Sequence, residues 1–179
     1  DTNSYDSTVG TAINDLSAGG TYDGTLVTGS NGVSSTLNAA TGALQFSSAY
    51  PNVGPYVDIT SNISTTPFNA NGMTVDFEAD FGANADNWER IIDFSEGAND
   101  NDNVLLGRDG STNNLILSVF NGNTLTQSCN YANAIPVNSG MNRWTVNFDG
   151  STCRMYKNGT LVYTQNSFTA KPTAGITWV

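Results

Sequence analysis

Three carboxylates at alternate positions of one predicted strand, Asp76, Glu78 and Asp80, are the strongest sign of chemistry in this sequence. Alternate residues of a strand point to the same face of a sheet, so the three side chains are expected to lie side by side. Glycoside hydrolysis uses two neighbouring carboxyl groups, one as the acid and one as the nucleophile or base. The same alternation also describes the solvent face of a half-buried strand, because the residues between the carboxylates are apolar. We favour the solvent face, predict no catalytic residues and do not expect an enzyme.

The sequence contains no histidine, which removes the commonest general base, the commonest zinc ligand and the Ser-His-Asp triad. Sixteen acidic residues against six basic ones give the 179-residue chain a net charge of −10. Since the six bases are scattered, nucleic acid is a poor partner for this acidic surface. No apolar run reaches the roughly 18 residues of a membrane-spanning helix, so membrane insertion is not expected.

Charged residues make up only 12% of the chain, and asparagine, serine, threonine and glycine take their place. An ordinary globular chain has about 25% charged residues. A surface solvated by amides and hydroxyls is typical of secreted, cell-surface and virion proteins. We therefore expect an extracellular, cell-surface or virion-surface location.

The segment 99–103 reads NDNDN and places Asp100 and Asp102 two residues apart, with an amide between them. Carboxylate and amide oxygens are ligands of calcium, so Asp100, Asp102 and the nearby Asp109 are candidate metal ligands. The segment lacks the glycine and the last glutamate of an EF-hand loop, and a solvated turn is the competing interpretation. Calcium is the one cofactor that the sequence suggests.

Tyr50, Tyr56 and Tyr131 lie near predicted turns, where an exposed aromatic ring is able to stack on a sugar ring. They are the candidate carbohydrate-binding residues. Cys129 and Cys153 both lie on predicted strands. In an oxidising compartment they would close a loop of about 25 residues and stabilise the fold by roughly 3 kcal/mol. Two buried free thiols are the other interpretation, and the sequence leaves both open.

The elements that must position these residues are antiparallel strands. Asp149-Gly150 and Asn158-Gly159 join three alternating strands between residues 143 and 164, and Asn121-Gly122 repeats the device upstream. Such pairs supply the two positive φ values that a type I′ turn requires. The sequence therefore predicts an all-β chain that forms a single domain over residues 1–179.

The order of short motifs along the chain resembles a laminin-G-like domain of the concanavalin A-like lectin/glucanase jelly-roll superfamily. The motifs are NSY at 3–5, NDLS at 14–17, DGTL at 23–26, ALQF at 43–46, YVDI at 56–59, MTVDF at 73–77, WERIIDF at 88–94, RWTV at 143–146, DG at 149–150 and YKNG at 156–159. The resemblance covers nearly the whole chain and implies an antiparallel β-sandwich jelly roll. It also implies that Trp144 opens a core strand and that Trp88 lies beside an inward-facing pair of isoleucines, so both are predicted to pack in the core.

The resemblance also has departures. Retaining glycoside hydrolases of this fold usually carry Glu, Asp and Glu where this chain has Asp76, Glu78 and Asp80, so the residue types are exchanged at all three places. Domains of the family usually have an apolar strand ahead of the present sequence and another after it. A sheet without its edge strands exposes unpaired backbone groups, so either the sequence is a fragment or a neighbouring chain fills the edge.

Together these features predict a non-catalytic structural or adhesive module of an extracellular or virion-surface assembly, such as a filament or fibre, with glycan binding as a further role. Its partners would be copies of itself or neighbouring subunits, and glycans. The first alternative is a stand-alone, calcium-assisted, lectin-like module that binds carbohydrate. The second is a retaining glycoside hydrolase.

Overall fold

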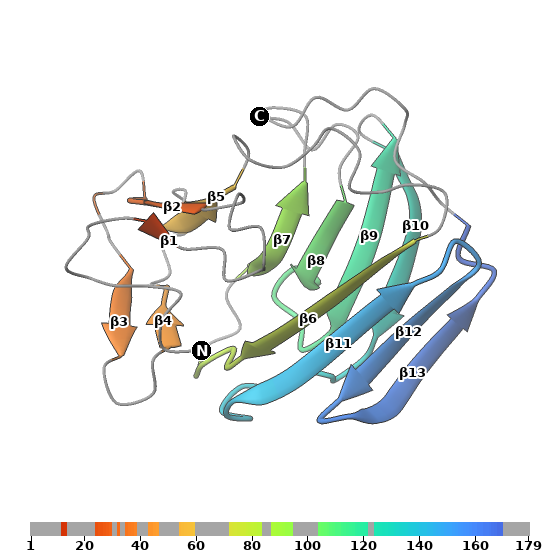
Figure 1. The fold of residues 1–179 in the computed structure, drawn as a ribbon. Helices are drawn as coiled ribbons and strands as arrows, with labels where there is room; N and C mark the ends of the chain where they lie inside the picture. The colour runs from red at the N-terminus through yellow and green to blue at the C-terminus, as the bar shows by residue number, and fades with distance from the viewer. Residues whose placement is uncertain are drawn as a thin grey trace, which may run out of the picture. The chain divides into compact units, whose positions relative to one another are not determined.

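The computed structural model describes residues 12–13, 24–29, 32, 35–38, 43–46, 54–59, 72–83, 87–94, 104–121 and 124–169. Within these residues every regular element is a β-strand and every strand pair is antiparallel (Figure 1). This confirms the predicted all-β class. No helix long and apolar enough to span a membrane is found in the described part of the chain. The chain divides into two compact units, Asp1–Ser64 and Thr65–Val179.

The unit Asp1–Ser64 contains two small sheets. In the first, β2 (Gly24–Val27) lies between β1 (Ala12–Ile13) and β5 (Tyr56–Asp58). In the second, β3 (Thr36–Asn38) pairs with β4 (Ala43–Gln45). A Cβ atom at Gly24 would lie 2.6 Å from Cγ1 of Val57. The close packing of β2 on β5 therefore requires glycine at this position.

The unit Thr65–Val179 contains two four-stranded sheets. The β6 sheet has the order β13-β12-β11-β6 and consists of β6 (Met73–Ala79), β11 (Asn142–Phe148), β12 (Thr152–Lys157) and β13 (Thr160–Asn166). The β7 sheet has the order β10-β9-β8-β7 and consists of β7 (Arg90–Phe94), β8 (Val104–Arg108), β9 (Leu115–Asn121) and β10 (Thr124–Tyr131). Figure 1 shows the two sheets as two layers, which confirms the predicted antiparallel β-sandwich.

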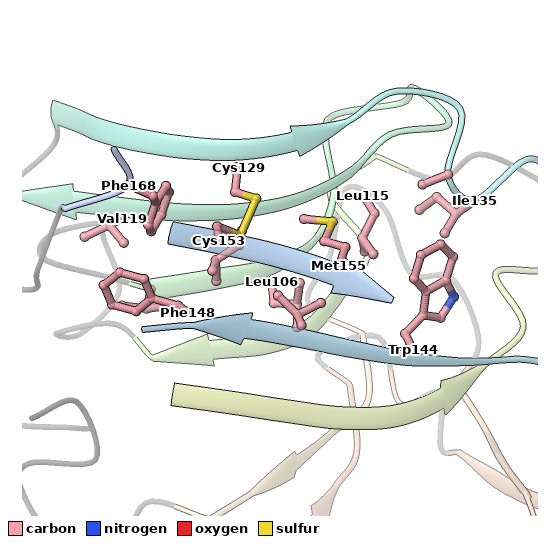
Figure 2. Close-up of a cluster of buried hydrophobic side chains, with 14 of the residues drawn as sticks. Leu106, Leu115, Val119, Cys129, Ile135, Trp144, Phe148, Cys153, Met155 and Phe168 are labelled. Atoms are coloured by element: carbon pink, nitrogen blue, oxygen red, sulfur yellow. A yellow bond between two sulfur atoms is a disulfide. The ribbon is translucent and has the colours of Figure 1, made fainter. Parts of the chain in front are cut away.

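The core lies between these two layers (Figure 2). Trp144, Val146 and Phe148 alternate along β11 and are 1%, 1% and 5% exposed. Leu106 and Leu117 contribute to the same cluster from the β7 sheet. Full burial of a large apolar side chain stabilises a fold by about 1.5–3 kcal/mol, so the alternation decides which face of β11 turns inward.

A disulfide joins Cys129 on β10 to Cys153 on β12 and so links the two sheets across the core (Figure 2). The two Cα atoms are 6.3 Å apart, within the usual range for a disulfide. Both residues are completely buried. Since the sequence has two cysteines, this bond leaves no free thiol.

The two hairpin turns of the β6 sheet are built differently. Asn158 and Gly159 have φ values of 50° and 79°, as a type I′ turn requires. At the other turn Gly150 has a φ of 83°, whereas Asp149 is not among the residues with positive φ. The Asp149 carboxylate instead accepts hydrogen bonds from the backbone N–H groups of Ser151 (2.9 Å) and Thr152 (2.7 Å). The type I′ prediction for Asp149-Gly150 is therefore wrong, because a side chain closes this turn.

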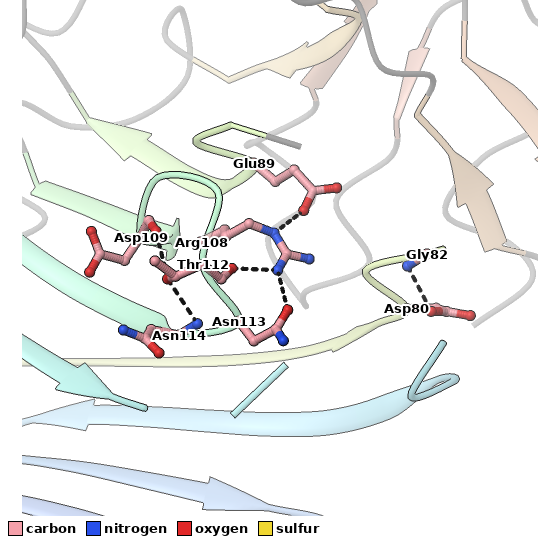
Figure 3. A network of polar contacts seen from close by, with 8 residues as sticks. All are labelled: Asp80, Gly82, Glu89, Arg108, Asp109, Thr112, Asn113 and Asn114. Carbon is pink, nitrogen blue, oxygen red and sulfur yellow. Dashed lines mark hydrogen bonds and ion pairs between the residues drawn. The ribbon is translucent and has the colours of Figure 1, made fainter. Parts of the chain in front are cut away.

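Arg108 is a fully buried charge at the end of β8, where its side chain faces the core. Its Nε donates to the Glu89 carboxylate and its Nη1 donates to the Thr112 carbonyl at 2.6 Å (Figure 3). The guanidinium carbon lies 5.5 Å from the centre of the Phe81 ring. Arg108 thereby ties the segment before β7 to the turn between β8 and β9.

The two sheets differ in their outer faces. On β8 and β9 the side chains that point away from the core are buried too, with Leu105, Ile116 and Ser118 at 2%, 4% and 1% exposure. On β6 the corresponding side chains, Thr74, Asp76 and Glu78, are exposed. Among the described strands of this unit, those of the β6 sheet therefore present the sandwich's open face.

Candidate functional site on the outer face of the β6 sheet

A row of four side chains crosses the outer face of the β6 sheet, one from each strand. The strand register places Asp76 opposite Thr145, Thr145 opposite Tyr156, and Tyr156 opposite Leu161. Directly opposed residues of an antiparallel pair share a face, and adjacent strands are about 4.8 Å apart. The row therefore combines a carboxylate, a hydroxyl, a phenol ring and an aliphatic side chain within about 14 Å.

Asp76 is the centre of the polar half of this row. Arg143 holds it with two hydrogen bonds, Nε to Oδ1 at 2.9 Å and Nη2 to Oδ2 at 3.2 Å. Thr145 donates a third, from Oγ1 to Oδ2 at 2.8 Å. These bonds, first from Arg143 and then from Thr145, hold the pKa of Asp76 below its ordinary value. The same pairing raises the pKa of Arg143, so both groups stay charged.

An open pocket of about 540 Å³ lies beside this ion pair, lined by Asp76, Arg143, Thr145, Asn158 and Gly159. The hairpin turn forms its wall and is fixed to β11. Asn158 Oδ1 accepts from the Arg143 backbone N–H at 3.0 Å, and the Asn158 N–H donates to the Arg143 carbonyl at 2.8 Å. The pocket is therefore bounded by groups that are already ordered before a ligand arrives.

Further polar side chains extend the face along the sheet. Asn147 Nδ2 donates to Thr74 Oγ1 at 2.8 Å, and Arg154 Nη1 donates to Asp149 Oδ2 at 2.7 Å. The hydrogen bond from Arg154, followed by those from Ser151, keeps the pKa of Asp149 well below its ordinary value. The outer face is thus a surface of paired donors and acceptors around one aromatic ring, Tyr156.

Two residues of the acidic triplet, Asp76 and Glu78, lie on a solvent-exposed face of the strand, as the sequence predicts. Both are on the outer side of β6, which ends at Ala79. Asp80 follows the strand, and its Oδ1 accepts from the Gly82 N–H at 2.9 Å. The ion pair with Arg143 was not foreseen, since its partners are 67 residues apart in the sequence.

The three tyrosines proposed for sugar stacking are placed differently from one another. Tyr50 lies outside the described residues, and Tyr56 is 46% exposed in the unit Asp1–Ser64. Tyr131 belongs to the other unit, packs against the core and stacks on Tyr163, with ring centres 5.5 Å apart. Tyr156 was not singled out, although it neighbours the inward-facing Met155 and strand alternation turns it outward.

The two tryptophans that were predicted to pack in the core, Trp88 and Trp144, lie in different environments. Trp144 is 1% exposed in the core, as predicted. Trp88 is 40% exposed, so the prediction that it packs in the core is wrong. It lies in a turn before β7 rather than on the strand, with a φ of 60° and its N–H bonded to the Gly110 carbonyl at 3.0 Å.

The predicted calcium ligands are not brought together in the described residues. Asp100 and Asp102 lie outside them. Asp109 is described, and its Oδ2 accepts from Asn130 Nδ2 at 2.8 Å. No group of three potential metal ligands occurs in the described part of the chain. Calcium binding stays a prediction.

The solved structures that are similar to this chain include two with the same sequence identity. One is the binding domain of botulinum neurotoxin DC in complex with rat synaptotagmin II, with 17% identity and a TM-score of 0.59 over 88% of this chain and 37% of that one. The other, described as HCR/D-Sa-GBL1/C, has 17% identity and a TM-score of 0.60 over 90% of this chain and 38% of that one. The present chain thus spans less than two-fifths of either. At this identity the likeness shows the fold, a β-sandwich. No protein-family model and no curated protein matches the chain.

Proposed function

We propose that this chain is a non-catalytic adhesive module of an extracellular or virion-surface assembly, and that it binds glycans on the outer face of the β6 sheet. The observation that carries the proposal is the outward-facing row of Asp76, Thr145, Tyr156 and Leu161 beside an open pocket, in which Asp76 and Leu161 are exposed and Thr145 and Tyr156 are half-buried. The laminin-G-like assignment within the jelly-roll superfamily, which rests on the order of sequence motifs, belongs to the same proposal.

A sugar ring offers hydroxyl groups that both donate and accept, and a flat apolar face of C–H groups. Asp76, the Asn158 side chain and the Thr145 hydroxyl oxygen, whose hydrogen is donated to Asp76, supply acceptors, while the remaining N–H groups of Arg143 supply donors. Tyr156, one strand away from Thr145, supplies a ring on which the apolar face of a sugar is able to stack. Because these groups are held by hydrogen bonds before binding, little ordering entropy opposes the complex.

Two observations support a binding role over hydrolysis. The pKa of Asp76 is lowered by Arg143, whereas a general acid in a glycosidase needs a raised pKa to keep its proton. Asp80 lies after the last residue of β6, and its carboxylate accepts a hydrogen bond from the Gly82 N–H in the loop that follows. The likeness to a toxin's binding domain is a precedent for a binding role on this fold, although that protein's partner is not implied here.

The direct test is a glycan array probed with the whole chain, followed by titration of the best ligand. Tyr156→Ala is expected to weaken binding about fivefold to tenfold, since an aromatic contact contributes about 1–1.5 kcal/mol. Tyr156→Phe keeps the ring and is expected to bind within about threefold of the wild type. Circular dichroism checks that both variants are folded. A blank array, or equal binding by Tyr156→Ala, would overturn the proposal.

The surface assembly and the calcium-assisted alternative are tested together by light scattering. A particle mass many times that of one chain supports a structural subunit, and a single-chain mass supports the stand-alone lectin-like module. If calcium binds at Asp100, Asp102 and Asp109, EDTA will lower glycan affinity or dissociate the particle. If neither the particle mass nor the glycan affinity changes in EDTA, the calcium-assisted alternative is wrong.

A further inference from the structure

We infer that the outer face of the β6 sheet selects neutral glycans and rejects those that carry sialic acid, uronate or sulfate. The inference rests on the proposed function, because it names the ligand class of the same site. It follows from the ion pairs that the cationic side chains of the unit Thr65–Val179 form with carboxylates.

Arg143 is the one cation among the residues that line the pocket. The Nε and Nη2 edge of its guanidinium, the edge that would grip a carboxylate or sulfate, is already occupied by both oxygens of Asp76. Glu78 lies directly opposite Arg143 on the neighbouring strand, and its charge contributes to the raised pKa of Arg143. Two carboxylates thus face one guanidinium, which leaves the group with a net charge of about −1 at neutral pH.

An anionic sugar would therefore either displace Asp76 or bind the remaining Nη1 side of the guanidinium, and in both positions its charge would lie close to the Asp76 and Glu78 carboxylates. A neutral sugar carries no such charge. Its hydroxyls accept from Nη1 of Arg143, which makes no hydrogen bond within the described residues, and donate to the Asp76 oxygens. While it is paired with Arg143, the Asp76 carboxylate thus accepts hydrogen bonds from neighbouring sugar hydroxyls and repels an anionic group.

The rest of the described surface offers no substitute cation. Each arginine in the described ranges forms an ion pair with a carboxylate: Arg90 with Asp93, Arg108 with Glu89, Arg143 with Asp76 and Arg154 with Asp149. Lys157, the described lysine, has its Nζ 5.2 Å from the centre of the Trp144 ring and 3.4 Å from the Ala134 carbonyl. The chain as a whole carries a net charge of −10, so its field opposes an approaching anion as well.

The test compares matched pairs of glycans that differ only in a terminal sialic acid or sulfate, titrated against the whole chain. The neutral member is expected to bind about tenfold more tightly or better at low salt. The ratio of the affinities for the neutral and the anionic glycan should decrease in about 0.5 M NaCl, because exposed charges are screened there. Glu78→Gln removes one carboxylate without changing a pocket-lining residue, and we expect it to reduce the preference about threefold to fivefold.

Asp93→Asn is the matched control, because it removes the same charge from a strand of the β7 sheet and should leave the preference unchanged. Equal or tighter binding of the sialylated or sulfated glycans would overturn this inference while leaving glycan binding in place. An identical shift in Glu78→Gln and Asp93→Asn would show that net charge, not this site, sets the preference, and would also overturn it. Failure to bind any glycan would overturn the inference and the proposed function together.

Discussion

Glu89→Gln is expected to destabilise this protein more than removal of the arginine that Glu89 contacts. Arg108 is 0% exposed at its side chain, whereas the side chain of Glu89 is 31% exposed. Breaking a buried ion pair by removing one partner costs about 3–5 kcal/mol when the remaining charge stays buried. Glu89→Gln leaves the Arg108 charge inside the core with carbonyl and amide partners, Thr112 and Asn113, and with its Nη2 unpaired in the described structure. We expect a loss of about 3 kcal/mol.

Arg108→Met has a smaller expected cost, because methionine fills the volume and the partner left behind is able to reach water. The change removes hydrogen bonds to Glu89 and Thr112 and the contact with the Phe81 ring. We expect a loss of about 1–2 kcal/mol. The double variant Arg108→Met/Glu89→Gln has no stranded charge, so it should be as stable as Arg108→Met and more stable than Glu89→Gln.

Guanidinium chloride unfolding followed by circular dichroism measures these free energies, provided that the m-value is unchanged. Asp93→Asn is the matched control, since it makes the same change in the exposed ion pair with Arg90, which is expected to contribute less than about 1 kcal/mol. A loss below about 1 kcal/mol for Glu89→Gln, or a double variant that loses the sum of both single changes, would refute the buried-charge argument.

Three further predictions follow from the sandwich. Replacing Cys129 and Cys153 by alanine should lower the free energy of unfolding by about 3 kcal/mol; denaturant curves that match those of the wild type would contradict this. Gly72→Ala should destabilise the fold by more than about 2 kcal/mol, because φ there is +96° and a Cβ would lie 1.9 Å from the Phe148 carbonyl oxygen; an unchanged melting temperature would contradict it. The folded-state pKa of Asp76 is lowered, so its stabilising contribution is present above about pH 4 and is lost as the pH falls through the lower folded-state pKa. Melting temperatures from pH 2 to 7 should therefore fall less steeply with acid in Asp76→Asn than in the wild type, and equal slopes would count against it.

Local signals in the sequence were sufficient to predict the strands and one of the turns. The alternation in Met73–Ala79 correctly separates the core face from the exposed face. Asn158-Gly159 correctly predicts a type I′ turn, because both residues adopt positive φ. Asp149-Gly150 carries the same signal and yet closes through the Asp149 carboxylate. A dipeptide therefore predicts that a turn occurs more reliably than it predicts how the turn is bonded.

Trp88 shows where the resemblance to a family pattern led to a wrong prediction. Its neighbours Ile91 and Ile92 pack against the core, which suggested an inward-facing tryptophan. The strand begins at Arg90, however, and Trp88 belongs to the turn before it. A backbone hydrogen bond to Gly110, on the turn between β8 and β9, fixes that turn. Contacts between two turns distant in sequence are not visible in a local pattern.

The candidate site depends on a long-range register that the sequence pattern alone does not determine. Within the core, β6 and β11 meet with Phe77 opposite Trp144 and Val75 opposite Val146. A slip of one residue would turn Trp144 outward, and a slip of two would move it away from Phe77. Either slip would also separate Asp76 from Thr145 on the outer face. The large side chains inside the sandwich therefore position the polar groups outside it, and the geometry of the candidate site is specified largely by residues that are not part of that site.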